Sequence, residues 1–350
     1  MPVNPQSQNP QAVKSGGLLS RRQLLRTGAA AAGIGAAGIL TGQGTRYAIA
    51  GNLTKIKLEW TEVAACHSPI GFALEKGIFA KHGLDVELFY QGASGQTLIQ
   101  ALATRKAEAG PGLLYDWLKP IEQGFDVKLF AGSHGGCQSI LTKQDSGIRT
   151  LTDLKGKTIG TFDVMSPSRV AFSVSLKKAG LDPEQDVTWK VFPFDLVAEA
   201  VLRGEADALA HMDPWAYGWE KEHKFHRVAD TQTGTFQDRV CCVLGVNGDY
   251  YEANKDTLKR VAAANLEVHQ YTLQHPDEVA QWYFDTLKPG MSVETLTEVL
   301  ASFTYHDHWF GDKLRDEVKR GYEDLKLTGV ADPSTDPEEI ASRITIDIFA

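Results

Sequence analysis

The sequence predicts an α/β protein with two lobes, each built on a mainly parallel sheet flanked by helices. Strand-length apolar runs alternate with helical segments, and this alternation is typical of parallel sheets. The pattern occurs twice: a Ser-Pro pair opens a helix at Ser68 and again at Ser166, and the Gly-Leu-Asp run at 83–85 returns at 180–182. Two such units predict two lobes, with a cleft at the carboxyl ends of their strands.

In the first unit, polar and apolar residues alternate over 55–61, which predicts a strand. A helix follows from Ser68, with the serine as its cap and Pro69 in its first turn. A second strand is predicted at 85–90. The small-residue turn after it leads into a helix that Ser94 can cap, and free N–H groups at such a helix start are a natural place for an anion.

The later elements follow the same rules. A further strand of the first unit is predicted at 127–132. The second unit has strands predicted at 157–161 and 187–192, with a helix from Ser166 between them. From 254 to the end the pattern is mostly helical and amphipathic, so helices are expected to complete the fold.

The first fifty residues have the pattern of a twin-arginine export signal. Arg21 and Arg22 follow a serine and precede paired leucines, and a weakly hydrophobic Ala/Gly run covers 28–42. The alternatives are a buried Ala/Gly helix or a membrane anchor, but the run is short and rich in glycine for an anchor. Ala48-Ile49-Ala50 fits a cleavage site, so the mature chain is expected to begin near Gly51.

The charge balance argues against nucleic acid as a partner. The chain has 36 basic and 44 acidic residues, and removing the five basic residues of the signal leaves 31 against 44. Proteins that bind nucleic acids present a basic surface instead. An anionic small molecule is still permitted, because helix N-termini supply local positive potential.

Three motifs carry a resemblance to a known family. They are Gly-Ile-Phe-x-x-x-Gly-Leu-Asp-Val at 77–86, Gly-Ala-Ser at 92–94, and Leu-Thr-Asp-Leu-Lys-Gly-Lys-Thr-Ile-Gly at 151–160. With these motifs the chain resembles the type II periplasmic solute-binding proteins of ABC importers, in the branch of sulfonate, taurine, nitrate and bicarbonate receptors. The resemblance covers nearly all of the mature chain and implies a two-lobed α/β fold with a two-strand hinge.

The resemblance also implies a domain layout. The signal peptide would cover 1–50, the first part of lobe 1 would cover 51–140, and lobe 2 would cover 141–240. The remainder, 241–350, would return to lobe 1 and supply the C-terminal helices. The strand-like runs at 138–143 and 240–247 would lie side by side as the hinge.

The implied function is that of a periplasmic substrate-binding component. Such a protein would capture a small anionic or zwitterionic solute, for example a sulfonate or nitrate, and deliver it to an ABC permease with its ATPase at the inner membrane. It would need no cofactor and catalyse no reaction. One alternative is a receptor for a metal or metal complex. Another is an enzyme of thiamine-pyrimidine synthesis, but the full cysteine run of that enzyme is absent and the export signal argues against a cytoplasmic pathway.

Ligand contacts are expected from the loops at the strand ends. Backbone amides near the serines could bind oxygens of the ligand, and the histidines could add a directed donor. For the serines the alternative is helix capping, and for the tyrosine it is core packing. The candidate residues are Cys66, His67, Ser68, Ser94, Gln96, Tyr115, His134, Cys137, Ser166, Ser168, His211 and Asp213.

All four cysteines fall in the strand-end loops or hinge: Cys66, Cys137, Cys241 and Cys242. Three explanations are open. Cys137 could form a disulfide with Cys241 or Cys242, because the crossovers should be neighbours and the compartment is oxidising. The cysteines could bind a soft metal together with nearby histidines, although no zinc-site spacing is present. They could also be small buried apolar residues. The Tyr-His-Asp-His-Trp run at 305–309 looks like a metal motif, but its place among C-terminal helices favours a polar surface or interlobe contact.

Overall fold

The computed structural model describes residues 52–90, 95–305 and 309–350, with side chains described throughout except at 95–97. The described residues belong to the second of two contact-defined units, which covers 47–350. The predicted export signal, Ser94, the side chain of Gln96 and residues 306–308 of the His-Asp-His run lie outside the description. Among the described helices, none has both the length and the hydropathy needed to cross a membrane.

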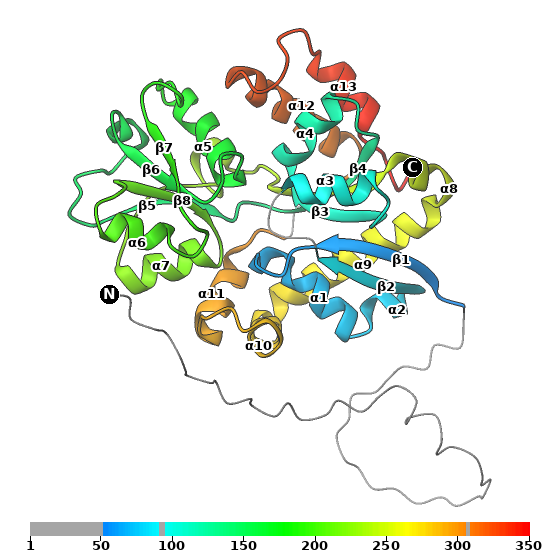
Figure 1. The fold of residues 1–350 in the computed structure, drawn as a ribbon. Coiled ribbons are helices and arrows are strands. Elements are labelled where there is room, and N and C mark those ends of the chain that lie inside the picture. Colours follow the sequence, from blue (N-terminus) through cyan, green and yellow to red (C-terminus); the bar gives the residue numbers. More distant parts are fainter. Residues whose placement is uncertain (1–51, 91–94, 306–308) are drawn as a thin grey trace, which may run out of the picture. The chain divides into compact units, whose positions relative to one another are not determined.

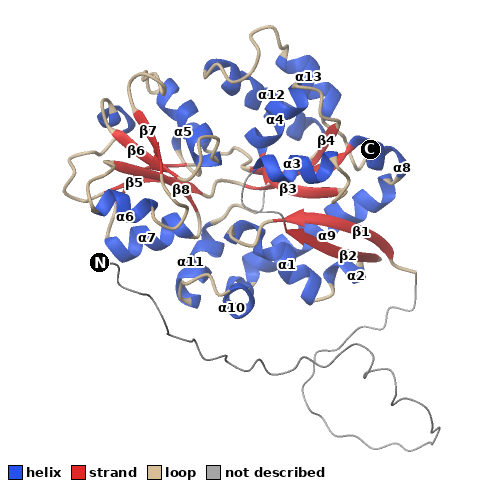
Figure 2. Cartoon of the chain, viewed as in Figure 1, coloured by secondary structure: helices blue, strands red, loops and turns tan. Residues whose placement is uncertain are grey.

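The first sheet has five strands in the order β2-β1-β3-β10-β4 (Figures 1 and 2). Its strands are β1 (Thr54–Trp60), β2 (Leu84–Tyr90), β3 (Ala109–Leu113), β4 (Val127–His134) and β10 (Cys242–Asn247). β1 pairs in parallel with both β2 and β3, whereas β10 runs antiparallel to β3 and β4. Four strands therefore share one direction, and the strand that opposes them comes from much later in the chain.

The second sheet repeats this arrangement, with the order β7-β6-β8-β5-β9. Its strands are β5 (Gln138–Thr142), β6 (Thr158–Thr161), β7 (Thr188–Val191), β8 (Ala208–Met212) and β9 (His226–Asp230). β6 pairs in parallel with β7 and β8, and β5 is antiparallel to β8 and β9. The predicted fold of two mainly parallel sheets built from one repeated unit is confirmed.

Helices cover both sheets (Figure 2). Those that follow strands of the first sheet are α1 (Ser68–Glu75), α2 (Ile78–Lys81), α3 (Gly95–Ala103), α4 (Leu114–Glu122), α8 (Gly248–Ala253) and α9 (Lys255–Gln274). Those of the second are α5 (Pro167–Lys178), α6 (Val197–Leu202) and α7 (Trp215–His223). The predicted C-terminal helices are α10 (Pro276–Leu287), α11 (Val293–Ser302), α12 (Gly311–Leu327) and α13 (Pro337–Ile344). Short 3₁₀ turns are η1 (Ala65–His67), η2 (Leu151–Leu154) and η3 (Gly234–Phe236).

The two Ser-Pro helix starts differ in their caps. Ser166 caps α5, because its Oγ accepts a hydrogen bond from the backbone N–H of Arg169 at 3.2 Å. Ser68 does not cap α1; the cap position belongs to His67, and the Ser68 hydroxyl donates backwards to the carbonyl of Ala65 at 2.7 Å. The predicted cap at Ser68 is therefore wrong, because Ser68 is already the first residue of the helix and follows directly on the turn η1.

The chain crosses between the sheets twice, and the crossings lie before the strands predicted to form the hinge. β5 belongs to the second sheet and β10 to the first, so the runs at 138–143 and 240–247 are not neighbours. The crossing segments are instead 135–137 and 231–241. They meet where the N–H of Cys241 donates to the carbonyl of His134 at 2.8 Å, and where Thr231 Oγ1 accepts from the N–H groups of Cys137 and Gln138, each at 3.1 Å.

Two glycines pack closely at the first crossing, and Gly136 makes the approach to Thr231 possible. A Cβ atom at Gly136 would lie 2.0 Å from the carbonyl oxygen of Thr231, and one at Gly135 would lie 1.9 Å from Oγ1 of Thr304. A side chain at 136 would therefore push the second crossing segment away, whereas a side chain at 135 would meet Thr304, which follows α11. The glycine-rich run after β4 therefore serves backbone packing at the crossing.

A buried ionic cluster ties the second crossing to the C-terminal helices. The Arg239 side chain, only 9% exposed, pairs with Glu317 and with Asp324 of α12, the latter at 3.1 Å. Asp324 also accepts from Lys178 of α5 at 2.6 Å and from the Tyr115 hydroxyl at 2.9 Å. One arginine thus joins the crossing segment to a helix that also contacts the second lobe.

We expect Arg239→Ala to lower the free energy of unfolding by about 3–5 kcal/mol, because it leaves the buried Glu317 carboxyl without its main counter-charge. The matched control is Arg105→Ala, which removes an ion pair with Asp249 whose side chains are 65% and 69% exposed. Such exposed pairs contribute less than about 1 kcal/mol. Urea unfolding curves of both variants measure the difference, and equal losses would contradict the role assigned to Arg239.

Candidate functional site

A pocket with about 520 Å³ of empty space, including its solvent-facing mouth, lies between the two sheets at the carboxyl ends of their strands. The first lobe contributes the ends of β1 and β3, the turn η1 and the starts of α3 and α4. The second lobe contributes the start of β5, the start of α5 and the end of β8. The lining residues are Glu59, Thr61, Ala64, Cys66, His67, Leu98, Pro111, Gly112, Leu113, Asp116, Cys137, Gln138, Pro167, Met212 and Cys242.

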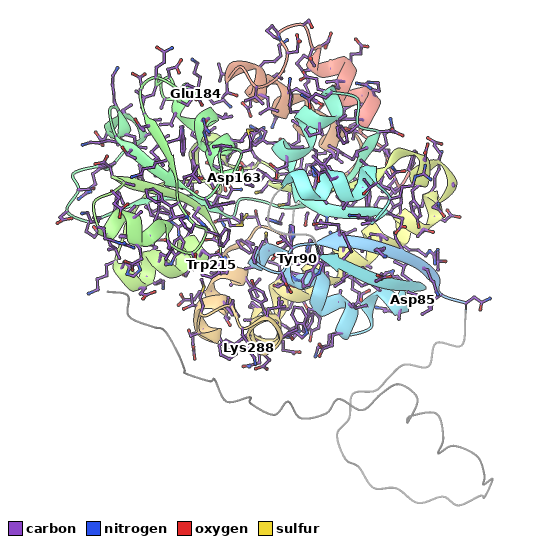
Figure 3. All side chains as sticks on the ribbon, viewed as in Figure 1. Asp85, Tyr90, Asp163, Glu184, Trp215 and Lys288 are labelled. Carbon is purple, nitrogen blue, oxygen red and sulfur yellow. The ribbon has the colours of Figure 1, made fainter. Side chains whose placement is uncertain are left out.

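Burial keeps most ionisable groups of this pocket close to neutral. Glu59 is 2% exposed, and burial raises its pKa to about 8. Burial raises the pKa of Asp116 to about 7, and the charge of Asp163 on the loop after β6 adds to the effect (Figure 3). Burial, with a smaller contribution from His134, lowers the pKa of His67 to about 3. The described lining contains no lysine or arginine.

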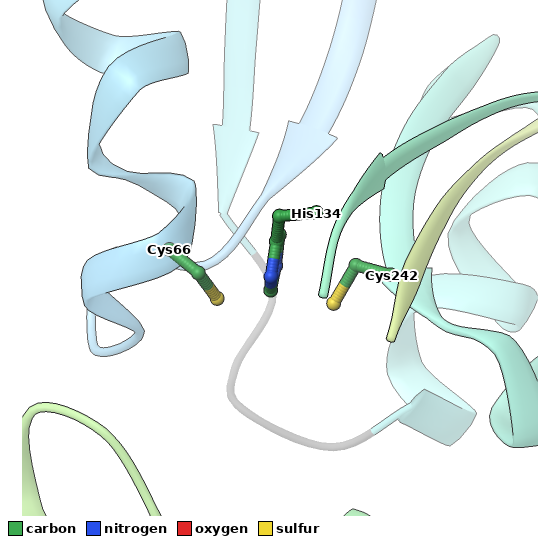
Figure 4. A group of neighbouring side chains, drawn as sticks. All are labelled: Cys66, His134 and Cys242. Carbon is green, nitrogen blue, oxygen red and sulfur yellow. The ribbon is translucent and has the colours of Figure 1, made fainter. Parts of the chain in front are cut away.

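A cluster of thiols and imidazole lies against this pocket. We define the cysteine–histidine cluster as Cys66 of η1, His134 at the end of β4 and Cys242 at the start of β10 (Figure 4). The donor atoms of these three residues lie within 4.8 Å of one another. His134 forms a second group of the same compactness with Cys137 and Cys241. The fold thus brings together residues from η1, β4 and β10, which lie far apart in the sequence.

All four cysteines are buried free thiols. Cys137 Sγ lies 3.7 Å from Cys241 Sγ, a distance for a thiol hydrogen bond that is well beyond a disulfide bond of about 2.05 Å. The predicted approach of Cys137 to the paired cysteines is therefore correct, while the bond itself is not formed. Hydrogen bonds from Cys241, Cys242 and Cys66 lower the pKa of Cys137, which makes it the thiol most ready to ionise.

His134 is oriented so that one ring nitrogen is free. Its Nδ1 lies within hydrogen-bonding distance of the carbonyl oxygen of Gly135, which assigns the proton to Nδ1. Its Nε2 is buried and has no hydrogen-bond partner among the described residues. The ring packs against Phe303 and Tyr305, and burial lowers the pKa of His134. The imidazole is therefore neutral, with a lone pair available at Nε2.

The candidate residues of the first lobe divide between the pocket and the interior. Cys66, His67 and Cys137 line the pocket, and His134 joins them through the cluster. The backbone N–H of Thr61 approaches His67 Nδ1 at 3.4 Å, which fixes the ring at the pocket wall. Tyr115 does not line the pocket; its hydroxyl donates to Asp324 and its ring packs on Phe236. Ser68 is buried by its contact with the preceding turn.

The candidates of the second lobe are buried and absent from the pocket lining. Ser166 caps α5, and Ser168 is buried with an Oγ that has no partner among described residues. His211 packs among the rings of Phe162, Phe194 and Trp219, and burial lowers its pKa to about 4. Asp213 accepts from the N–H of Tyr217 at 3.0 Å, and burial raises its pKa to about 8. In the pocket lining this lobe is represented by Gln138, Pro167 and Met212.

Several lining residues escaped sequence reasoning. Glu59 lies in an alternating strand, where nothing marks one polar residue as buried. Asp116 lies in the first turn of α4, where an acidic residue is ordinarily explained by the helix dipole. Gln138 follows Cys137 directly and begins one of the predicted crossovers. Because the crossovers were expected to meet near the cleft, its position was the one sign that it could line the pocket. Its Oε1 is buried without a partner among described residues.

Solved structures share this fold. The alkanesulfonate-binding protein SsuA from Xanthomonas axonopodis pv. citri, bound to MOPS, superposes with a TM-score of 0.69 and 16% identity, over 85% of this chain and 99% of that one. The periplasmic nitrate-binding protein NrtA from Synechocystis gives a TM-score of 0.69 and 15% identity, over 84% and 86%. At these identities the likeness shows the fold, a two-lobed type II periplasmic binding protein.

The matches to sequence relatives cover a smaller part of those proteins. The bicarbonate transport ATP-binding protein CmpC of Synechococcus elongatus is 26% identical over 250 residues, which are 66% of this chain and 37% of that protein. The nitrate import ATP-binding protein NrtC of Synechocystis is 24% identical over 277 residues, 73% of this chain and 40% of that protein. The chain spans about two fifths of these relatives. The family model described as NMT1/THI5 like matches residues 64–279, more than half of the chain, and the protein therefore belongs to the NMT1/THI5-like family.

Proposed function

We propose that the protein is the substrate-binding component of an ABC importer and captures a small solute in the pocket between its lobes. The observation that carries the proposal is the pocket lining, which draws on the strand ends of both sheets at the place where the chain crosses twice. Closure of two lobes around a ligand is a standard mode of such a fold. The closed shape would then be recognised by the permease with its ATPase.

The family and fold agree with this proposal. The solved structures named above are a sulfonate-binding and a nitrate-binding protein, and the sequence relatives are named for bicarbonate transport and nitrate import. We infer binding without turnover, because the pocket needs only to hold and release its solute. The fact that the family name includes THI5 keeps pyrimidine synthesis as the enzymatic alternative to be tested.

Two ligand classes follow from two sets of observations. The relatives favour a small anion or zwitterion such as a sulfonate, nitrate or bicarbonate. The pocket favours a cation, because its described lining offers thiols, imidazole and carboxyl groups and no lysine or arginine. An oxyanion would therefore depend on backbone N–H groups near the helix starts, whereas a metal or metal complex would find side-chain donors in place.

We further propose export to the periplasm by the twin-arginine pathway, supported by Arg21, Arg22 and the apolar run after them. This pathway carries folded proteins, so a buried cluster of thiols would reach the oxidising compartment already enclosed. N-terminal sequencing of the exported protein tests the proposal. A mature chain that begins near Gly51 is expected, and an intact Met1 on periplasmic protein would contradict it.

Gln138→Leu should weaken solute binding by roughly tenfold, because it removes a pocket-lining amide whose buried oxygen has no partner among the described residues. Thermal unfolding with bicarbonate, nitrate, ethanesulfonate, MOPS, zinc and copper measures binding. A solute at a hundred times its Kd should raise Tm by about 5 °C.

The control for this prediction is Gln144→Leu, the same change at an exposed position outside the pocket. It should bind as the unmodified protein does. Equal binding by the Gln138 variant would contradict the placement of the solute, and a panel without any stabilising member would contradict the receptor function.

A further inference from the structure

We propose that the cysteine–histidine cluster of Cys66, His134 and Cys242 binds a thiophilic d¹⁰ metal ion, zinc(II) or copper(I). The inference rests on the proposed receptor function and names a ligand for the same pocket. Thiolate and imidazole are the donors that both ions prefer. Three protein donors also leave an open coordination position, which suits an ion that must be bound and released.

The geometry of the cluster supports one ion. Cys66 comes from the turn before α1, His134 from the end of β4, and Cys242 from the start of β10, yet their donor atoms lie within 4.8 Å of one another. Figure 4 shows the imidazole between the two thiols. An ion at the centre would reach all three donors with small side-chain rotations.

The unused nitrogen of His134 is an independent sign of a missing partner. A buried polar atom normally has a hydrogen bond, and leaving one unpaired costs about 1–3 kcal/mol. His134 is 1% exposed, its Nδ1 faces the carbonyl of Gly135, and its Nε2 has no partner among the described residues. A backbone carbonyl on one nitrogen is the arrangement that orients a histidine as a metal ligand through the other.

The pocket supplies access and a suitable charge. Cys66 and Cys242 of the proposed cluster both line it, whereas the other group, with Cys137 and Cys241, lines it through Cys137 alone, so the proposed cluster offers an arriving ion more donors. Lysine and arginine are absent from the described lining, so no fixed positive charge repels a cation there. Met212 adds a thioether on the second-lobe side, a further soft donor that the closed form could present.

Binding must release protons. Each of the two thiols loses one proton as its sulfur bonds to the metal, while the neutral imidazole donates its lone pair without losing any. Two protons are therefore released for each ion, and binding should tighten as pH rises. A disulfide between Cys137 and Cys241 would need an external oxidant and would leave the proposed cluster intact.

The test uses the full mature protein, purified without oxygen and with its four thiols counted after unfolding. Zinc(II) and copper(I) are titrated separately against chromophoric chelators. We expect one ion per chain, and a roughly 100-fold loss of affinity in Cys66→Ser and in Cys242→Ser. The matched control is Cys241→Ser, an equally buried neighbouring thiol outside the pocket, which should keep its affinity within about threefold.

A measurement without variants covers the case in which a serine variant does not fold. Cobalt(II) bound to the unmodified protein should show thiolate-to-metal charge-transfer absorption. No uptake of either ion, absence of this absorption, or equal affinity in all three variants would overturn the proposal. If a sulfonate or oxyanion still stabilised the protein in that case, the receptor function would stand and the metal site alone would be wrong.

Discussion

The double crossing of the chain between the sheets is the constraint on which the rest of the structure depends. Thr231 accepts from two successive N–H groups of the first crossing, and the carbonyl of His134 accepts from Cys241 of the second. Glycine is needed at 136, because a Cβ atom there would overlap the Thr231 backbone of the opposite segment. The same crossings contribute Cys137 and Gln138 to the pocket lining and place Cys137 Sγ 3.7 Å from Cys241 Sγ. The backbone packing at the crossing therefore also determines where the nearby thiol and imidazole groups lie.

Burial determines what this pocket can hold. Where side chains are largely buried, the neutral forms of acids and imidazoles are favoured, as the raised pKa of Glu59 and the lowered pKa of His67 show. Thiols and a neutral imidazole bind soft cations well, but they provide no positive charge to stabilise an oxyanion. The buried Arg239 is paired with Glu317 and Asp324 and is absent from the pocket lining, so it adds no positive charge there. The chemistry of the lining and the names of the relatives thus favour different ligands.

Much of the fold could be predicted from the sequence, because a repeated alternation of strands and helices predicts parallel sheets directly. The hinge assignment was wrong because a strand-like run does not reveal which sheet it joins: Gln138–Thr142 and Cys242–Asn247 have similar patterns and pair in different sheets. Some residues at the candidate pocket could be named from the sequence, and their role in binding stays a prediction. Cysteines and histidines are conspicuous by type, so Cys66, His67, His134 and Cys137 could be named, whereas the burial of Glu59 depends on tertiary packing that no local pattern encodes. Ser94 and Gln96 stay predictions.

The central claim is that the space between the lobes holds a solute, and a crystal structure of the protein purified from its own host tests it most directly. We predict density in the pocket, in contact with Cys66 or Cys242 on one side and with Gln138 or Met212 on the other. Anomalous scattering at the zinc and copper edges would identify a metal in that density. A solute bound to an outer surface of either lobe, with the pocket filled by side chains, would contradict the claim.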